Sequence, residues 1–139
     1  MSSSENDFCK VSLDNSRQVA TLFWKREVKL LEFQDGCRQL ASLFINHNIS
    51  RCLIESTNRG SLSMEAEDWL NTLRSSVALQ ANHLQVALVM SDERYQNLIY
   101  DYSLSHTQPL DLPIHFNYFT CIEDAMDWLL HEQPSQATA

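Results

Sequence analysis

Glycine and proline are scarce in this sequence, with only two and three among 139 residues. The chain contains no GxGxxG, GxxxxGK or GxSxG motif. Nucleotide binding through glycine-rich loops and the nucleophile elbow of many hydrolases are therefore excluded. No apolar run approaches the roughly 20 residues that a membrane-spanning helix requires, and the polar N-terminus does not resemble a secretory signal. We expect a cytoplasmic protein without an integral membrane segment.

Basic residues are also few: 10 against 18 acidic residues, for a formal net charge of -8. This charge opposes binding to a polyphosphate backbone, so nucleic acid is not an expected partner. The one basic cluster, Lys25, Arg26 and Lys29, is interpreted as a solvated surface, with anion binding as the alternative. Glu65 and Glu67 are interpreted as favourable charges at a helix N-terminus rather than as catalytic carboxylates.

Patterns that bind metals are missing as well. The four cysteines have no CxxC spacing, and the five histidines form no HxxxH or HxH pair. We predict four unpaired thiols, most of them in the core, with no metal site and no cofactor. No nucleophile with a neighbouring base is recognisable, so no catalytic residue is assigned.

The sequence does contain a regular alternation of strand and helix periods. Alternating residues from Cys9 to Leu13 and the apolar run from Val19 to Trp24 predict an opening hairpin. Helix and strand periods then alternate through residues 29–46, 52–54, 63–77, 86–90, 95–102, 114–118 and 122–129. This pattern predicts a single α/β domain over residues 8–131 with the order ββαβαβαβα, a mostly parallel sheet and an antiparallel first strand. Residues 1–7 and 132–139 are predicted to be flexible tails.

The central strands and the last helix should supply the deepest core residues, which we predict to be Leu53, Ile54, Val86, Leu88 and Leu129. Replacing Leu88 with Ala should then cost about 2 to 5 kcal/mol.

The segment from Glu55 to Ser63 joins the end of a predicted strand to the start of a predicted helix. In open α/β sheets, ligands and partners bind at this edge. The candidate partner-binding residues are Ser56, Asn58, Arg59, Ser61 and Ser63. An ordinary turn with Ser63 as helix cap is the alternative interpretation.

The hairpin, the following helix and strand units, the serine-bearing loop and the closing segment Glu123–Leu129 resemble the STAS-like superfamily of anti-sigma-factor antagonists. The similarity covers residues 8–131 and is greatest to the divergent bacterial STAS/Sec14-like branch. It implies a (βα)n superhelix with sequential parallel strands. In the switching members, a serine in an Asp-Ser-x-Gly motif is phosphorylated. The matching stretch here, 58–63, lacks the Asp, and the resemblance implies Ser61 and Ser63 as phosphorylation sites.

The resemblance implies a nonenzymatic protein-interaction or regulatory module that presents the 55–63 loop and the second helix to a protein partner. The alternative is a small-molecule or lipid-binding domain of Sec14-like character that uses aromatic residues such as Trp69, Tyr102 and Phe119, for which core packing is the simpler role. An enzyme has the least support. A sizeable apolar cavity would favour ligand binding, and a filled core with a protruding loop would favour the interaction module.

The strand from Val19 to Trp24 is apolar on both faces. If the helices of the superhelix all cover one face, Trp24 or Phe23 would lie exposed on the open sheet. A homodimer would cover such a patch on both chains. A doubly wound sheet, with helices on both faces, would hide it within a monomer.

Overall fold

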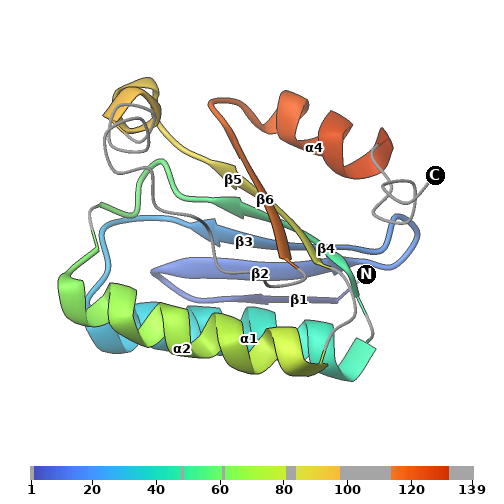
Figure 1. The fold of residues 1–139 in the computed structure, drawn as a ribbon, viewed down its shortest axis with the longest axis horizontal. Coiled ribbons are helices and arrows are strands. Elements are labelled where there is room, and N and C mark those ends of the chain that lie inside the picture. Colours follow the sequence, from blue (N-terminus) through green and yellow to red (C-terminus); the bar gives the residue numbers. More distant parts are fainter. Residues whose placement is uncertain (1, 48, 61, 81–83, 98–113, 132–139) are drawn as a thin grey trace.

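The computed structural model describes residues 2–47, 49–60, 62–80, 84–97 and 114–131 (Figure 1). Six strands form one sheet in sequential order: β1 (Ser2–Glu5), β2 (Cys9–Asp14), β3 (Val19–Trp24), β4 (Arg51–Glu55), β5 (Leu84–Val89) and β6 (Ile114–Phe119). The helices are α1 (Leu30–His47), α2 (Met64–Gln80) and α4 (Ile122–His131), and residues 92–97 are also helical. The β1–β2 and β2–β3 pairs are antiparallel, and the remaining pairs are parallel. The predicted α/β class and its mixed sheet are confirmed.

The N-terminal segment differs from the prediction, because residues 1–7 were expected to form a flexible tail. Instead Ser2–Glu5 form β1, an edge strand paired with β2 from Ser2↔Leu13 to Glu5↔Lys10. The connecting turn is closed by the Asn6 side chain, whose Oδ1 accepts hydrogen bonds from two backbone N–H groups at 3.0 and 2.8 Å. The Lys25 ammonium forms an ion pair with Glu5 and donates to the Asn6 carbonyl. The predicted C-terminal tail, 132–139, lies outside the described residues.

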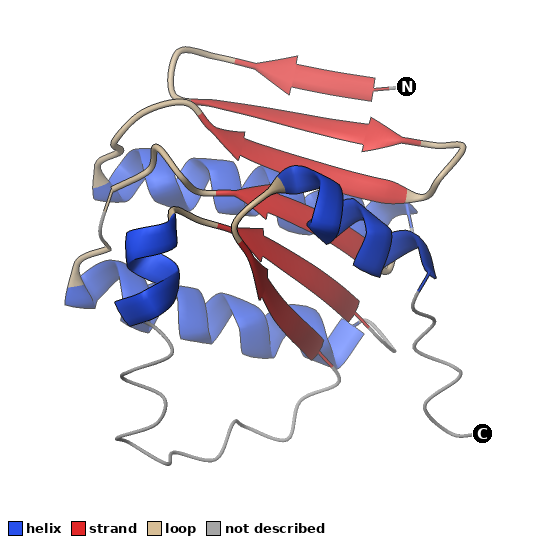
Figure 2. Ribbon diagram, turned by 90° about the horizontal axis from the view of Figure 1, so that it is seen from above, coloured by secondary structure: helices blue, strands red, loops and turns tan. Residues whose placement is uncertain are grey.

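The helices cover both faces of the sheet, which corrects the expectation of a one-sided superhelix (Figures 1 and 2). Helices α1 and α2 lie side by side on one face, as right-handed crossovers between sequential parallel strands require. Helix α4 follows the last strand and connects no two strands. The handedness rule for crossovers therefore does not determine which face of the sheet α4 covers. This helix packs on the opposite face against β4, β5 and β6. There it buries Val19 and Leu53, while Phe23 is half-buried.

The larger core lies between the sheet and α1. The Trp24 side chain at the end of β3 is fully buried and stacks on Phe33 of α1, with ring centroids 5.6 Å apart. Gly36, one turn further along α1, makes this packing possible. A Cβ atom at position 36 would lie 2.5 Å from the Cη2 atom of Trp24. The glycine lowers the helix propensity of α1 by roughly 1 kcal/mol relative to Ala, and it leaves room for the indole ring.

Within the described ranges, none of the helices combines the length and the apolar character that crossing a membrane would require.

Candidate functional site

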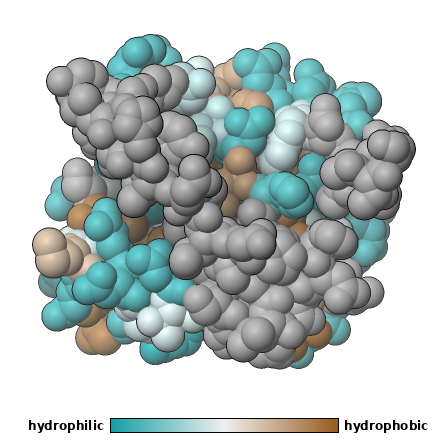
Figure 3. Space-filling view, viewed as in Figure 1, coloured by the Kyte–Doolittle hydropathy of each residue, from teal (hydrophilic) through white to brown (hydrophobic). Residues whose placement is uncertain are grey.

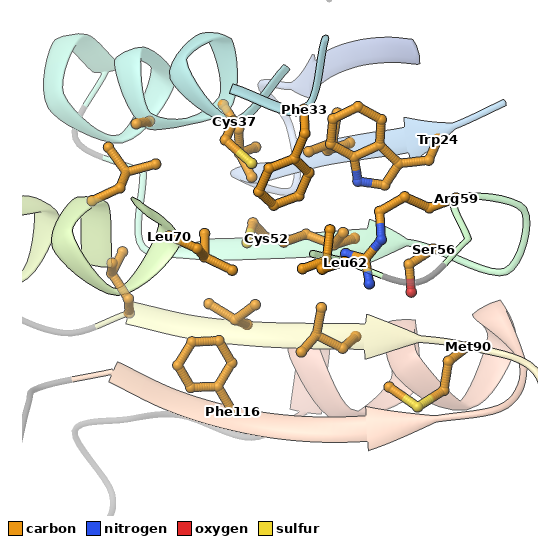
Figure 4. A pocket seen from close by; sticks show the side chains of 18 of the residues that line it. Trp24, Phe33, Cys37, Cys52, Ser56, Arg59, Leu62, Leu70, Met90 and Phe116 are labelled. Carbon is orange, nitrogen blue, oxygen red and sulfur yellow. The ribbon is translucent and has the colours of Figure 1, made fainter. Parts of the chain in front are cut away.

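A cavity of about 180 Å³ lies between the sheet and helices α1 and α2 (Figure 4). Side chains of β3, β4, β5 and β6 form its floor, and side chains of the two helices and of the 56–62 loop complete its wall. Most of the lining is apolar. The aromatic lining residues among the described residues are Trp24, Phe33, Phe44 and Phe116. The cavity therefore offers an apolar ligand a site inside the domain.

Three residues predicted to be deeply buried, Ile54, Val86 and Leu88, line this cavity. Ile54 and Leu88 are only partly buried, because their side chains face the open space rather than a packed neighbour. Leu53, Val86 and Leu129 are buried as predicted, with 2%, 5% and 0% of their surface exposed.

The end of the cavity at the carboxyl edge of the sheet carries polar groups. Trp24 ends β3, Ser56 follows β4, and Arg59 comes from the loop between β4 and α2. In Figure 4 the Arg59 side chain reaches back over the sheet toward Leu62, and the indole nitrogen of Trp24 faces the same space. The opposite end, around Cys37, Leu70 and Phe116, is apolar.

Glycine at position 60 shapes the loop that carries Arg59. Its φ is +87°, a left-handed conformation that L-residues rarely adopt. A Cβ atom there would lie 2.9 Å from Cγ of Glu27. The Arg59 backbone N–H donates to the Ser56 carbonyl at 3.2 Å, which closes the turn. The arginine is thus held by a tight, conformationally demanding loop.

The Arg59 guanidinium lies over the Phe33 ring, 5.8 Å from its centroid. It takes part in no salt bridge among the described residues. Burial, together with repulsion from Arg94, lowers the pKa of Arg59 to about 10, so the side chain is still a cation at neutral pH. A half-buried cation without a carboxylate partner therefore lies at the polar end of the cavity.

The structure gives the other predicted loop residues different positions. Ser56 is 2% exposed, and its hydroxyl donates to the Val89 carbonyl at 2.8 Å, so it joins β4 to the end of β5 rather than facing a partner. Asn58 is exposed. The Ser63 hydroxyl accepts a hydrogen bond from the Ala66 N–H at 3.1 Å, which makes Ser63 the cap of α2. Ser61 lies outside the described residues, so its predicted phosphorylation remains a prediction.

Among the aromatic residues considered for ligand binding, Trp69 and Phe119 pack elsewhere. Trp69 makes an edge contact with Phe33, and Phe119 packs on Trp128 on the α4 face. Tyr102 lies outside the described residues. Sequence reasoning missed Trp24 as a cavity residue, because an apolar strand position predicts burial but not the space beside it. A signal was present in Gly36, a helix-interior glycine that indicates a close approach.

Two of the three residues of the basic cluster after β3 form ion pairs within the chain. Arg26 donates to both carboxylate oxygens of Glu32, at 3.1 and 2.8 Å, and to Asp7 at 3.0 Å. Lys25 pairs with Glu5. The solvated-surface interpretation therefore fits these residues better than anion binding.

The four cysteines form no disulfide: Cys9, Cys37 and Cys52 are buried, and Cys121 is exposed. Burial raises the pKa of Cys52, so this thiol is unreactive at neutral pH. No group of three or more His, Cys, Asp or Glu side chains suited to a metal ion occurs in the part of the chain that the structure describes.

Comparison with known proteins defines the fold. The chain is similar to the crystal structure of an uncharacterized protein of the DUF3478 family from Shewanella loihica PV-4, which is described as having a SpoIIAA-like fold. The TM-score is 0.59 at 17% sequence identity, covering 93% of this chain and 98% of the other. The chain thus has a SpoIIAA-like (STAS) fold, as the resemblance implied. No protein-family model and no curated protein matches the sequence.

Proposed function

We propose that the protein binds a small, mainly apolar molecule in the cavity between the sheet and helices α1 and α2. The observation that carries this proposal is an apolar-lined space of about 180 Å³, partly open to solvent, between the sheet and the two helices. Protein interiors are normally close-packed, with few voids larger than a water molecule. A bound apolar ligand would fill this space and remove its apolar lining from water.

The size of the cavity limits what can bind. An apolar cavity of roughly 150 Å³ accommodates a benzene molecule and stays dry without it. A single aromatic ring or a chain of about six carbon atoms is therefore the expected scale, and a full-length lipid chain exceeds it. The ligands expected from the Sec14-like alternative are thus small molecules rather than lipids.

Titration with 1-hexanol, measured by isothermal titration calorimetry, tests this proposal. The Ile54→Phe variant should lose binding, because a larger side chain at this lining position fills the space. Leu31 is 77% exposed and does not line the cavity, so Leu31→Phe is the matched control and should bind as the wild type does. Failure of the wild type to bind, or unchanged binding by Ile54→Phe, would contradict the proposal.

A nonenzymatic protein-interaction role remains the second candidate, and one observation favours it. Met64, the first residue of α2, is 79% exposed beside the loop that carries the exposed Asn58. An apolar side chain at the carboxyl edge of the sheet is the kind of anchor that protein interfaces use. Binding of a purified partner that Met64→Ser weakens, without a change in hexanol affinity, would support this second role.

Self-association is a separate proposal. It was first based on an apolar patch on an uncovered face of the sheet, but α4 covers much of that face. The remaining exposed large apolar residues include Leu31 and Ile45 of α1 and Ile122 of α4. On the face in Figure 3, hydrophobic atoms of the described residues form small areas among hydrophilic ones. Light scattering at micromolar concentration distinguishes a dimer from a monomer of 16.1 kDa.

A further inference from the structure

The Arg59 guanidinium is a cation without a carboxylate partner in a protein whose formal net charge is -8. The guanidinium lies over the Phe33 ring at 5.8 Å from its centroid, and its Nε donates to the Gly60 carbonyl at a long 3.4 Å. A second guanidinium, that of Arg94, reaches the same loop through a 3.5 Å contact with the Ser56 carbonyl. Most of the N–H groups of Arg59 are therefore available to an anion at this end of the cavity.

Trp24 provides an independent observation. Its side chain is 0% exposed, and its Nε1 has no hydrogen-bond acceptor among the described residues. Buried indole N–H groups usually find an acceptor, because water is not available to replace it. Trp24 lines the cavity, and in Figure 4 its nitrogen faces the space into which Arg59 points. The same space thus holds an unpartnered buried donor and an unpaired cation.

We propose that the cavity selects a short-chain or single-ring carboxylate, whose two oxygen atoms are held by the Arg59 guanidinium and Trp24 Nε1 while its apolar body occupies the cavity. This inference rests on the proposed ligand-binding function and names the chemical class of the ligand. A guanidinium presents parallel N–H donors that match the two oxygens of a carboxylate. The indole N–H supplies one further donor, and the remaining wall is apolar. The arrangement therefore fits one anionic group on a small apolar body.

Calorimetric titration with hexanoate and 1-hexanol at pH 7 tests the inference, because these ligands share their apolar chain and differ in charge. We expect the wild type to bind hexanoate at least about tenfold more tightly than hexanol, as for a charge-assisted hydrogen bond. Arg59→Met should abolish this preference and keep hexanol binding. Trp24→Phe, which removes Nε1, should weaken hexanoate binding more than hexanol binding. Retained hexanol binding also shows that each variant is folded with its cavity intact.

Arg38→Met is the matched control. Arg38 is an exposed cation that lies over Trp69, 5.4 Å from its centroid, and it does not line the cavity. Its replacement should leave the preference for hexanoate unchanged. Equal affinity of the wild type for the two ligands, or a preference that survives in Arg59→Met, would overturn the carboxylate proposal while leaving apolar binding in place. Binding of neither ligand would overturn the proposed function and the carboxylate proposal together.

Discussion

The two faces of the sheet are packed in different ways. On one face, α4 packs on β4, β5 and β6, and Leu129 and Ala125 of the helix are fully buried. On the other face, α1 and α2 together cover a larger area, yet a cavity of about 180 Å³ remains beneath them. The face with two helices is thus the less completely filled one.

The difference comes from which side chains meet on each face. The α4 face is filled by buried aliphatic residues such as Val19 and Leu53, with Phe119 and Trp128 packed against them. The opposite face carries a stack of Trp24 on Phe33, and an open space remains beside it. The leucines around that stack do not fill the remaining space. Stability therefore depends more per residue on the α4 face, and ligand binding is expected on the other.

The largest predicted effect separates the two faces directly. Leu129→Ala removes a fully buried side chain from the α4 face and should lower the free energy of unfolding by about 2 to 5 kcal/mol. Leu88 already borders the cavity and is only partly buried, so Leu88→Ala should cost less than about 2 kcal/mol. This value replaces the larger loss expected from the sequence. Urea unfolding measures the loss of stability in both variants, provided that the m-value is the same as in the wild type.

Equal losses for the two leucines would mean that the cavity face is as tightly packed as the α4 face. The comparison between the faces would then fail, and the proposed ligand site with it.

A second prediction concerns Gly36, which leaves room for the Trp24 ring on the cavity face. Gly36→Ala should destabilise the protein by about 1 to 3 kcal/mol, although alanine favours the helix by roughly 1 kcal/mol. The reason is the 2.5 Å approach that the added Cβ would make to Cη2 of Trp24. Thermal unfolding of the single variant provides the measurement.

The Trp24→Phe background is the control for this prediction, because phenylalanine lacks the outer atoms of the indole. There, Gly36→Ala should become neutral or stabilising. A loss that persists in this background would show that the glycine is required for a reason other than the indole ring.

The sequence predicted the order of elements well, because residues that alternate or repeat at helical spacing carry a signal within a few positions. It missed β1, since Ser2–Glu5 is polar and without a period and is held in place by backbone pairing and by Lys25. The side of the sheet taken by α4 was also mispredicted. A terminal helix has no crossover to fix its side, and only tertiary packing decides it.

The candidate site was predicted in part. The loop at the carboxyl edge was correctly placed between β4 and α2, and Arg59 lines the cavity together with Ser56 and Leu62 of that loop. Ser56 was expected at a surface loop, although its hydroxyl makes a buried structural hydrogen bond, whereas the alternative interpretation of Ser63 as a helix cap is confirmed. The cavity itself could not be predicted. A cavity depends on how side chains from several helices and strands pack together in space, and the sequence pattern describes each element separately.

The smallest predicted effect concerns how each covering helix begins. Glu32 lies in the first turn of α1, where it accepts from Arg26 and from the Lys29 backbone N–H. The hydrogen bonds from Arg26, followed by that from the Lys29 backbone, lower the pKa of Glu32 to about 2. The charged form is thus favoured in the folded state. Its contribution to stability is present above about pH 4.5 and should be lost as the pH falls toward 2.

The matched comparison uses Glu123, which occupies the first turn of α4 on the other face and is exposed. Glu32→Gln should lower the urea midpoint at pH 6 and flatten its decrease between about pH 4.5 and pH 2, whereas Glu123→Gln should leave the shape of the pH profile close to that of the wild type. The effect of Glu32 is small because the pair lies near solvent and is screened by salt, so it should be largest at low ionic strength. Superimposable pH profiles for Glu32→Gln and the wild type would show that the pair with Arg26 does not anchor the helix over the cavity, and that packing alone holds α1 in place.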